Sequence, residues 1–356
     1  MTVAKKKRVL VVDDSAFMRR VLTEIIESDP RYEVVGAAGD GVEALRVVEA
    51  LQPDIITMDV ELPELDGITC VAYIMHEFPT PIVMVSGFSS YTGVKTIEAL
   101  ELGAVGFVHK PKATAGRNVR AAIRDELLSQ LAIAAQVDVR RLVPVGDRAS
   151  IVNQPTTGKT AEKLVVIASS SGGPRALSQV IPKLPADLAA AVLVVQHMPA
   201  DFIAPLAERL DRGSSLIVKV AEAGELLQHG RVLIAPGDAA CRVVADPRGH
   251  QRLIELTMPS DGVLLCYSAA NIVMESAALV YGRNATGVVL TGMGSDGTDG
   301  LRAIKNHGGH TIAEHESTCV VYGMPKTAIE AGVVDQVVAL PDVAGAITNT
   351  VKGVPR

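Results

Sequence analysis

The chain has 356 residues, 48% of them hydrophobic, with a formal net charge of −6 and four cysteines that form no CxxC pair. This length is enough for about two domains, and the negative charge argues against nucleic acid as the main partner, because phosphate binding requires a basic face. No apolar stretch approaches the ~20 residues of a membrane-spanning helix, and the N-terminus lacks the core of a signal peptide. Scattered thiols are typical of a reducing compartment. We therefore expect a cytoplasmic protein without membrane insertion.

Strand-like and helix-like segments alternate over residues 8–125. Strands are expected near residues 8–12, 33–37, 54–58, 81–85 and 105–108. The first of these runs is apolar over Val-Leu-Val-Val, which is typical of a strand buried on both faces of a parallel sheet. Five such βα units predict a doubly wound α/β domain whose site lies at the carboxyl ends of its strands.

Acidic residues follow two of these strands. Asp13 and Asp14 end the first strand, and Asp59 ends the third. Because the carboxyl ends of strands in an open parallel sheet converge, the three carboxylates should share one pocket. Unit charges ~4 Å apart repel by about 4 kcal/mol at an effective dielectric constant of 20, so we expect a cation there. Oxygen ligands suit Mg²⁺, and the sequence therefore predicts a magnesium site on these three residues.

Two further polar side chains follow the fourth and fifth predicted strands. Ser86 could donate a hydrogen bond to a phosphoryl group, and Lys110, at the end of Phe107-Val108-His109-Lys110-Pro111, could supply the counter-charge. Together with the three acids, these residues resemble the receiver domain of two-component response regulators, which has a flavodoxin-like (βα)5 fold. The resemblance implies that Asp59 is the phosphoacceptor and that Ser86, Phe107 and Lys110 sense the aspartyl phosphate.

Residues 126–161 are predicted to be a linker whose first residues could be helical. The apolar period fades there, while Arg, Pro, Gly, Thr and Gln accumulate. We therefore place the receiver domain at 1–125 and a second domain at 162–352. The linker segment 153–160 (Asn-Gln-Pro-Thr-Thr-Gly-Lys-Thr) is similar to a P-loop, but Asn153 replaces its first glycine and no buried strand precedes it, so we expect no nucleotide site.

The α/β pattern resumes in the second half of the chain. Strands are expected near residues 163–168, 191–196, 215–220, 231–235 and 286–290, with strand or hairpin signals at 242–256. This pattern predicts a doubly wound, mostly parallel α/β domain. Its first strand ends in Ser169-Ser170-Ser171-Gly172-Gly173-Pro174, a hydroxyl cluster on a strand-to-helix turn.

Hydrolases of the α/β class present a nucleophilic serine on such a turn, usually as G-x-S-x-G. The five residues centred on Ser170 read A-x-S-x-G, one glycine short of that pattern. The local pattern leaves all three serines as candidate nucleophiles, and it also leaves the alternative of a polar turn that merely caps a helix.

A nucleophilic serine requires a base and usually an acid that orients the base. His197 follows the next strand and is expected beside the serine turn. Asp296 lies in the glycine-rich segment 291–300, where Asp299 competes for the same role, and an N-cap is the structural alternative for Asp296. The backbone N–H groups of this segment could also bind an oxyanion. Three later histidines are expected in surface turns without metal-binding spacing, namely His307, His310 and His315.

Residues 162–350 are similar to the catalytic domain of chemotaxis protein-glutamate methylesterases, the CheB family. The matching motifs are Ser169–Gly173, Gln196–Pro199, Arg231–Gly237, Thr291–Gly297 and Tyr322–Pro325. The resemblance implies that Ser170 is the nucleophile, that His197 is the general base and then acid, and that Asp296 orients His197. It further implies that the Met293 N–H is the oxyanion donor.

The chain departs from the CheB pattern at three places. Ala168 replaces a glycine and Ser171 replaces a threonine, which are small changes. Residues 267–271 read Tyr-Ser-Ala-Ala-Asn where the family usually shows R-P-S-V-D. We expect this change to leave the triad untouched and to alter the substrate-facing surface or the interdomain contact, which makes an unusual receptor or a pathway other than chemotaxis an alternative.

The resemblances predict a phosphorylation-activated methylesterase of a two-component chemotaxis pathway. The phosphodonor would be the histidine kinase of a chemosensory array, and the substrates would be methyl-accepting chemotaxis receptors, whose glutamines the enzyme would also deamidate. Mg²⁺ in the receiver domain is the expected cofactor, with none in the catalytic domain, and the unphosphorylated receiver would cover the Ser170 cleft. The alternatives are a binding module without hydrolysis, and a DNA-binding response regulator, for which the acidic second half offers no basic helix-turn-helix.

Overall fold

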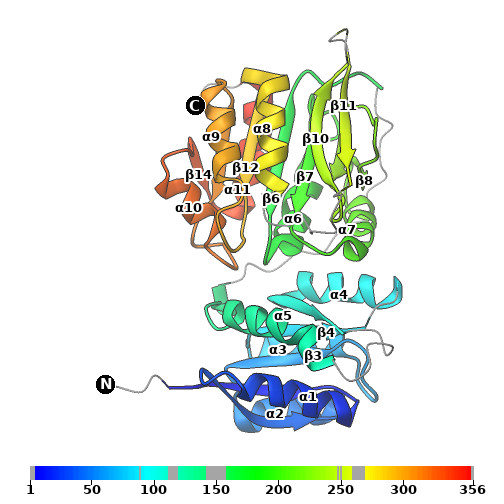
Figure 1. The fold of residues 1–356 in the computed structure, drawn as a ribbon, viewed down its shortest axis with the longest axis vertical. Helices are drawn as coiled ribbons and strands as arrows, with labels where there is room; N and C mark the ends of the chain where they lie inside the picture. The colour runs from blue at the N-terminus through cyan, green and yellow to red at the C-terminus, as the bar shows by residue number, and fades with distance from the viewer. Residues whose placement is uncertain are drawn as a thin grey trace. The chain divides into compact units, whose positions relative to one another are not determined.

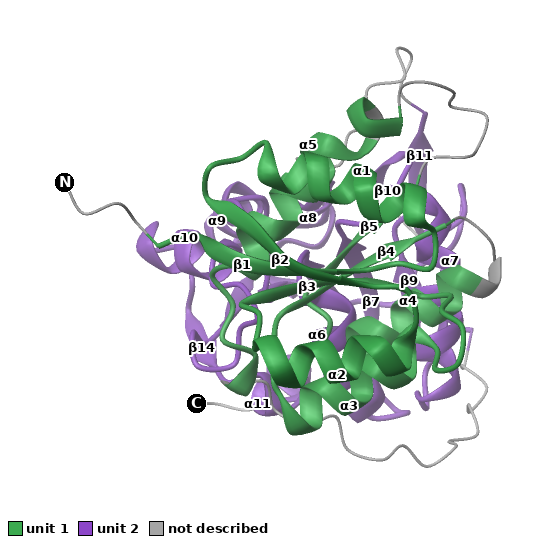
Figure 2. Ribbon diagram, turned by 90° about the horizontal axis from the view of Figure 1, so that it is seen from below, with its two compact units in different colours: residues 1–142 green, residues 143–356 purple. Residues whose placement is uncertain are grey.

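The computed structural model describes residues 5–87, 90–110, 119–141, 158–246, 248, 251–258 and 269–353. The chain divides into two compact units, residues 1–142 and 143–356 (Figures 1 and 2). This division falls within the segment that the sequence predicts to be a linker. Among the described residues, no helix combines the length and the apolar character needed to cross a membrane.

The first unit is a parallel five-stranded sheet with helices on both faces. The strand order is β2-β1-β3-β4-β5, which is the flavodoxin-like order. The strands are β1 (Lys7–Val12), β2 (Tyr32–Ala38), β3 (Ile55–Asp59), β4 (Ile82–Ser86) and β5 (Gly106–His109). Its described helices are α1 (Ala16–Glu27), α2 (Gly41–Leu51), α3 (Gly67–Glu77), α4 (Ser90–Leu102), α5 (Val119–Ala134) and the short 3₁₀ helix η2 (Val139–Arg141). Figure 2 shows α1 and α5 on one face and α2, α3 and α4 on the other. The five strands confirm the predicted pattern to within two residues at each end.

Helix α5 extends into the predicted linker. Ile123, Leu127 and Leu131 recur every four residues and are almost completely buried, because they face β5 and α1. This period places them on one stripe of the helix. The residues up to Ala134 therefore belong to the core of the first unit.

The second unit contains a seven-stranded sheet in which every strand pair is parallel. The strand order is β14-β13-β12-β6-β7-β9-β8, and a separate antiparallel hairpin pairs β10 with β11. The strands are β6 (Leu164–Ser169), β7 (Ala191–Gln196), β8 (Ile217–Val220), β9 (Arg231–Ile234), β10 (Ala240–Ala245), β11 (Arg252–Thr257), β12 (Ala285–Val289), β13 (His310–Glu314) and β14 (Gln336–Val338). The fold class predicted from the sequence is confirmed, whereas the short strands β13 and β14 were not predicted.

The helices of the second unit cover both faces of this sheet. They are α6 (Gly173–Val180), α7 (Ala200–Arg212), α8 (Ala269–Tyr281), α9 (Thr298–Asn306), α10 (Met324–Glu330) and α11 (Leu340–Lys352), with the 3₁₀ helices η3 (Ile181–Lys183) and η4 (Gly282–Asn284). Helix α8 packs against α9 and the hairpin strand β10, while α6 packs against α11 (Figure 1).

The strand order positions the candidate site. From β6 the chain first adds β7 on one side and later returns to add β12 on the other. In open α/β sheets, the crevice at such a reversal of strand order holds the ligand, outside the carboxyl ends of the strands. The turns that follow β6, β7 and β12 therefore meet at one edge of the sheet.

Replacing Leu131 by alanine should lower the free energy of unfolding of the first unit by about 2–5 kcal/mol, because a fully buried side chain is truncated. Ser129→Ala, at an exposed position of the same helix, should change it by less than about 0.5 kcal/mol. Urea unfolding followed by circular dichroism measures both values. If Leu131→Ala were as stable as the wild type, the end of α5 would belong to the linker.

Candidate active site

A glycine fixes the turn between β6 and α6. Strand β6 ends at Ser169, and the helix begins at Gly173. Gly172 precedes the helix with a φ of 80°, and a Cβ atom at this position would lie 2.5 Å from the Cβ atom of Val320. Only glycine tolerates both this left-handed backbone and the crowding.

The structure separates the three adjacent serines. Ser169 is fully buried, and its Oγ donates a hydrogen bond to Gln196 Oε1 at 2.7 Å. Ser170 is partly exposed, its N–H donates to Thr291 O at 3.0 Å, and a Cβ atom on Gly292 would lie 2.7 Å from the Ser170 Cβ atom. Ser171 contacts the same turn through its carbonyl, which accepts the Thr291 hydroxyl at 2.9 Å. Among the three serine side chains, the Ser170 side chain is thus the one that lies against the Gly292 backbone.

His197 and Asp296 are in direct contact. His197 follows β7, and its N–H donates to Ser169 O at 2.9 Å, which ties it to the serine turn. Its Nε2 lies 2.7 Å from Asp296 Oδ2, and both side chains are largely buried. Asp299 is instead exposed in the first turn of α9, where it pairs with Arg302. Of the two candidate acids, Asp296 is the one beside the histidine.

Backbone N–H groups hold the Asp296 carboxylate in place. Oδ2 accepts a hydrogen bond from Ala270 N–H at 2.9 Å. Oδ1 accepts hydrogen bonds from Asn271 N–H and from Gly297 N–H, both at 3.0 Å. A carboxylate fixed in this way can hold an imidazole in one orientation.

The prediction that the segment 267–271 leaves the triad untouched is wrong. Residues 269–271 begin α8, and the N–H groups of Ala270 and Asn271 donate to the carboxylate of Asp296, the predicted triad acid. The Asn271 side chain also accepts hydrogen bonds from Gly297 N–H at 2.9 Å and Gly300 N–H at 2.8 Å, so it shapes the loop that carries the acid. Residues 267 and 268 lie outside the described residues.

The histidine contact determines which ring nitrogen is available for proton transfer. With Nε2 facing Asp296, Nδ1 is the nitrogen that remains for exchange with a serine hydroxyl. Among the described residues no hydrogen bond joins Ser170 Oγ to His197, and such bonds often form only when substrate is bound. An oriented base beside a partly exposed serine can perform nucleophilic hydrolysis.

Gln196 joins the serine turn to the histidine turn, a role that was not predicted from the sequence. Its Nε2 donates to Ser170 O and to His197 O, each at 3.0 Å, and its Oε1 accepts the Ser169 hydroxyl. This largely buried amide ends β7 opposite Ser169 in the sheet register. A polar residue directly after an apolar strand was the available signal.

The predicted oxyanion donor lies in the turn after β12. Within the described part of the chain, the N–H of Met293 donates to no protein acceptor, and the Met293 side chain is half exposed. The preceding Gly292 carbonyl accepts hydrogen bonds from Gly323 N–H at 3.1 Å and Met324 N–H at 2.8 Å, which fixes the turn. A free N–H on a fixed turn beside a serine can stabilise a developing oxyanion.

The three predicted acids of the first unit also lie together. Oxygen atoms of Asp13, Asp14 and Asp59 lie within 4.8 Å of one another, as the convergence of β1 and β3 predicts. Lys110 Nζ lies 2.7 Å from Asp13 Oδ2 and 2.5 Å from Asp59 Oδ2. Burial raises the pKa of Asp59 to about 6, and Lys110 opposes this shift. An oxygen-only set of this charge fits a hard divalent cation.

Two of the three phosphate-sensing candidates, Ser86 and Lys110, lie at the strand ends beside this cluster. Ser86 is fully buried at the end of β4, where its Oγ donates to Gly87 O at 3.0 Å and its carbonyl accepts Lys110 N–H at 2.8 Å. Phe107 is buried within β5. Pro111, which follows Lys110 in the motif, lies outside the described residues. The structure thus brings Ser86 and Lys110 to the acidic edge of the sheet.

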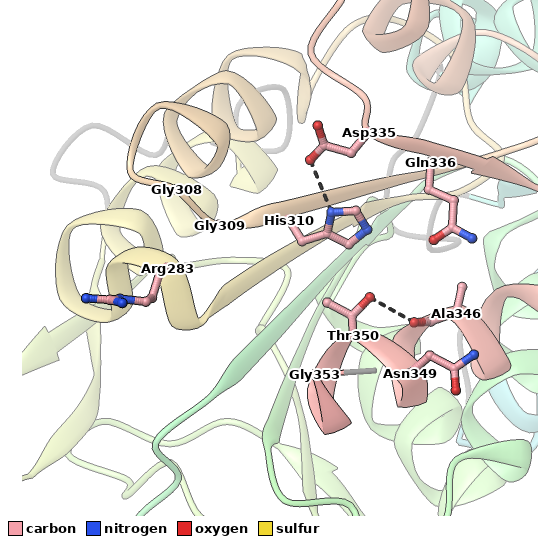
Figure 3. Close-up of a pocket in the computed structure, with 10 residues that line it drawn as sticks. All are labelled: Arg283, Gly308, Gly309, His310, Asp335, Gln336, Ala346, Asn349, Thr350 and Gly353. Atoms are coloured by element: carbon pink, nitrogen blue, oxygen red, sulfur yellow. Dashed lines mark hydrogen bonds and ion pairs between the residues drawn. The ribbon is translucent and has the colours of Figure 1, made fainter. Parts of the chain in front are cut away.

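A pocket of about 690 Å³ lies at the opposite end of the second sheet, where β13 begins and α11 ends (Figure 3). The prediction of a surface turn at His310 is wrong, because His310 begins β13 and its largely buried ring places Nδ1 3.2 Å from Asp335 Oδ2. His307 and His315 are exposed in turns, as expected. These three histidines therefore take no part in the candidate site.

Comparison with known proteins decides the family. A family model for CheB methylesterase matches residues 165–347, and one for the response regulator receiver domain matches residues 9–123. The protein-glutamate methylesterase/protein-glutamine glutaminase of Symbiobacterium thermophilum is 45% identical over 357 residues, which covers 97% of this chain and 97% of that protein. The chain belongs to the CheB methylesterase family.

Two further comparisons agree with this family. A protein of the same name from Thermotoga maritima is 45% identical over 332 residues, covering 93% of this chain and 94% of that protein. The crystal structure of the T. maritima CheB methylesterase catalytic domain is similar with a TM-score of 0.50 and 41% identity, covering 52% of this chain and 97% of that chain. A CheB domain that occupies the second half of the chain argues against the DNA-binding alternative.

Replacing Gln196 by leucine should slow modification of Ser170 by a sulfonyl fluoride about 10- to 100-fold, because each buried group left unpaired costs about 1–3 kcal/mol. Gln179→Leu, at another buried glutamine of the same unit, should react at close to the wild-type rate. Mass spectrometry of the labelled protein measures both rates. Equal rates for Gln196→Leu and wild type would exclude this positioning role.

Proposed function

We propose that the chain is a phosphorylation-activated protein-glutamate methylesterase that also acts as a protein-glutamine deamidase. The observation that carries this proposal is the 2.7 Å contact between His197 Nε2 and Asp296 Oδ2 beside the Ser170 turn. The curated relatives support the substrate class, because they are named protein-glutamate methylesterase/protein-glutamine glutaminase. The intact set of Ser170, His197 and Asp296 argues against a binding module without hydrolysis.

In the proposed reaction, His197 Nδ1 takes the proton of Ser170 Oγ as this oxygen attacks the ester carbonyl of a methylated glutamate. The Met293 N–H stabilises the negative charge on the carbonyl oxygen of the tetrahedral intermediate. His197 then returns the proton to the leaving methoxide, so that methanol departs and an acyl-enzyme remains. Asp296 keeps the imidazole oriented and stabilises its protonated form.

Water completes the cycle by the same proton transfers. His197 Nδ1 removes a proton from water, which attacks the acyl carbonyl, and the proton passes to Ser170 Oγ as the glutamate is released. With glutamine as substrate, ammonia leaves in place of methanol and the same acyl-enzyme forms. Both activities therefore require one set of residues.

In the receiver domain, Asp59 would accept the phosphoryl group, and Asp13, Asp14 and Asp59 would hold Mg²⁺. When bound, Mg²⁺ offsets the charge of the carboxylates and of the incoming phosphoryl oxygens. Lys110 already lies within ion-pair distance of Asp59, so a phosphoryl group there would meet a cation. Ser86 would donate to a phosphoryl oxygen, and Phe107 would respond to the new position of Ser86.

The proposed partners follow from these two chemistries. A histidine kinase of a chemosensory array would be the phosphodonor, and methyl-accepting chemotaxis receptors would be the substrates. Phosphorylation would increase the access of substrate to Ser170, which requires a differential interaction between the two receiver states and the rest of the chain.

The Ser170→Ala variant should release methanol from methylated receptor at least about 10³-fold more slowly than wild type, because the residual rate depends on binding and oxyanion stabilisation alone. Ser171→Ala, in the same turn, should retain most of the activity. Gas chromatography of the released methanol measures each rate. A larger loss of activity in Ser171→Ala than in Ser170→Ala would show that Ser171, and not Ser170, is the nucleophile.

The Asp59→Asn variant should lose the stimulation of methanol release by acetyl phosphate and Mg²⁺, because its side chain cannot form an acyl phosphate. Asp125→Asn, at an exposed position of α5, should be stimulated like the wild type. The readout is the ratio of the rates with and without the phosphodonor. Stimulation that survives in Asp59→Asn would exclude Asp59 as the phosphoacceptor.

A further inference from the structure

Glu314 is a buried carboxyl group that the proposed mechanism does not use. It ends β13, and its side chain is fully removed from solvent. Its Oε2 accepts a hydrogen bond from Thr291 N–H at 2.8 Å. Its Oε1 has no hydrogen-bond partner of normal geometry among the described residues. A buried carboxyl group with one unpaired oxygen is costly, so its position calls for an explanation.

Thr291 connects this carboxyl group to the nucleophile. The Thr291 carbonyl accepts the Ser170 N–H at 3.0 Å, and the Thr291 hydroxyl donates to Ser171 O at 2.9 Å. The next residue, Gly292, approaches the Ser170 side chain closely, and Met293 carries the proposed oxyanion donor. Thr291 therefore links Glu314 to Ser170 directly. Two peptide bonds lie between Thr291 and Met293, the proposed oxyanion donor.

The surroundings of Glu314 favour its neutral form. Burial raises its pKa to about 7, and the hydrogen bonds from Thr291 N–H and from the side chains of Thr318 and Cys319 oppose this shift only in part. Cys319 is the titratable neighbour, and burial raises the pKa of its thiol as well. Glu316 acts on Cys319, and no salt bridge of the described residues includes Glu314. No described cation offsets a charge on Glu314.

We propose that Glu314 is a positioning residue for hydrolysis, and that it supports the reaction while its carboxyl group carries a proton. This inference rests on the proposed role of Ser170. The neutral group accepts the Thr291 N–H and so holds the Ser170 turn and the Met293 backbone in register. Ionisation would place a buried negative charge without a cation partner on the residue that holds Thr291, and like charges in a low-dielectric site repel strongly, which disfavours a second negative charge on the oxyanion.

The test compares the pH dependence of the full-length wild type with that of Glu314→Gln, whose amide can still accept the Thr291 N–H without carrying a charge. Hydrolysis of methylated receptor and labelling of Ser170 by a sulfonyl fluoride are both measured from about pH 6 to about pH 9. The wild-type rates should fall on the alkaline side of about pH 7, and Glu314→Gln should lack this fall. With a pKa of about 7, about 3% of Glu314 carries a proton at about pH 8.5, so the variant should be about 30-fold faster than the wild type at this pH.

A matched control is Glu316→Gln, which removes an exposed charge from the same loop without touching Thr291. This variant should retain the alkaline fall of the wild type. Superimposable profiles for wild type and Glu314→Gln would overturn the inference, because a purely structural residue would not change the shape of the profile. If the protein does not hydrolyse methylated receptor although Ser170 is still labelled, only the proposed function is contradicted. The pH profile of Ser170 labelling would then still decide the role of Glu314.

Infrared spectroscopy of the wild type supplies a readout that needs no variant. A buried protonated carboxyl group should give an absorption band at about pH 6 that disappears as the pH rises through about 7. In Glu314→Gln the part of this band that disappears through about pH 7 should be missing, whereas any contribution of Asp59, whose pKa burial raises to about 6, should remain. A wild-type spectrum without such a band at about pH 6 would also overturn the inference, whether or not the variant folds.

Discussion

The contact between His197 Nε2 and Asp296 Oδ2 is the interaction on which the account of this protein depends. It selects Asp296 over Asp299, and it leaves Nδ1 as the nitrogen that can serve Ser170. The contact exists because Asp296 is held by three backbone N–H groups, two of them from the start of α8. A surface aspartate on a mobile side chain would not fix an imidazole in this way, because the contact would compete with water.

The parallel sheet brings this contact to the nucleophile. β6, β7 and β12 are neighbours, so the residues that follow them meet at one edge although about 27 to 126 positions separate them in the sequence. Gln196 joins the turns after β6 and β7, and Thr291 joins the turns after β6 and β12. The same principle gathers Asp13, Asp59 and Lys110 in the first unit, where an acidic cluster with one lysine fits phosphoryl chemistry.

Local sequence patterns were sufficient for most strands and for the acidic cluster, whereas the choice of Ser170 and Asp296 among neighbouring candidates required the resemblance to a known family. Apolar runs mark buried strands, and polar residues directly after them mark the functional edge. The support of the site was not predictable in this way. Asn271 and Gln196 act through contacts between segments that are distant in the chain, and β13 was missed because its run His-Thr-Ile-Ala-Glu contains one large apolar residue. Burial removes Ser169 from the three candidate serines, because Ser169 is fully enclosed, whereas Ser170 and Ser171 are both partly exposed.

The most direct test of the account is nitrogen-15 NMR of the imidazole groups, with His197 assigned by comparison with a His197→Gln variant. The account predicts that neutral His197 carries its proton on Nε2, that this proton has the downfield shift of a strong hydrogen bond to a carboxylate, and that the shift is lost in Asp296→Asn but kept in Asp299→Asn. A proton on Nδ1, or a downfield signal that survives in Asp296→Asn, would contradict it.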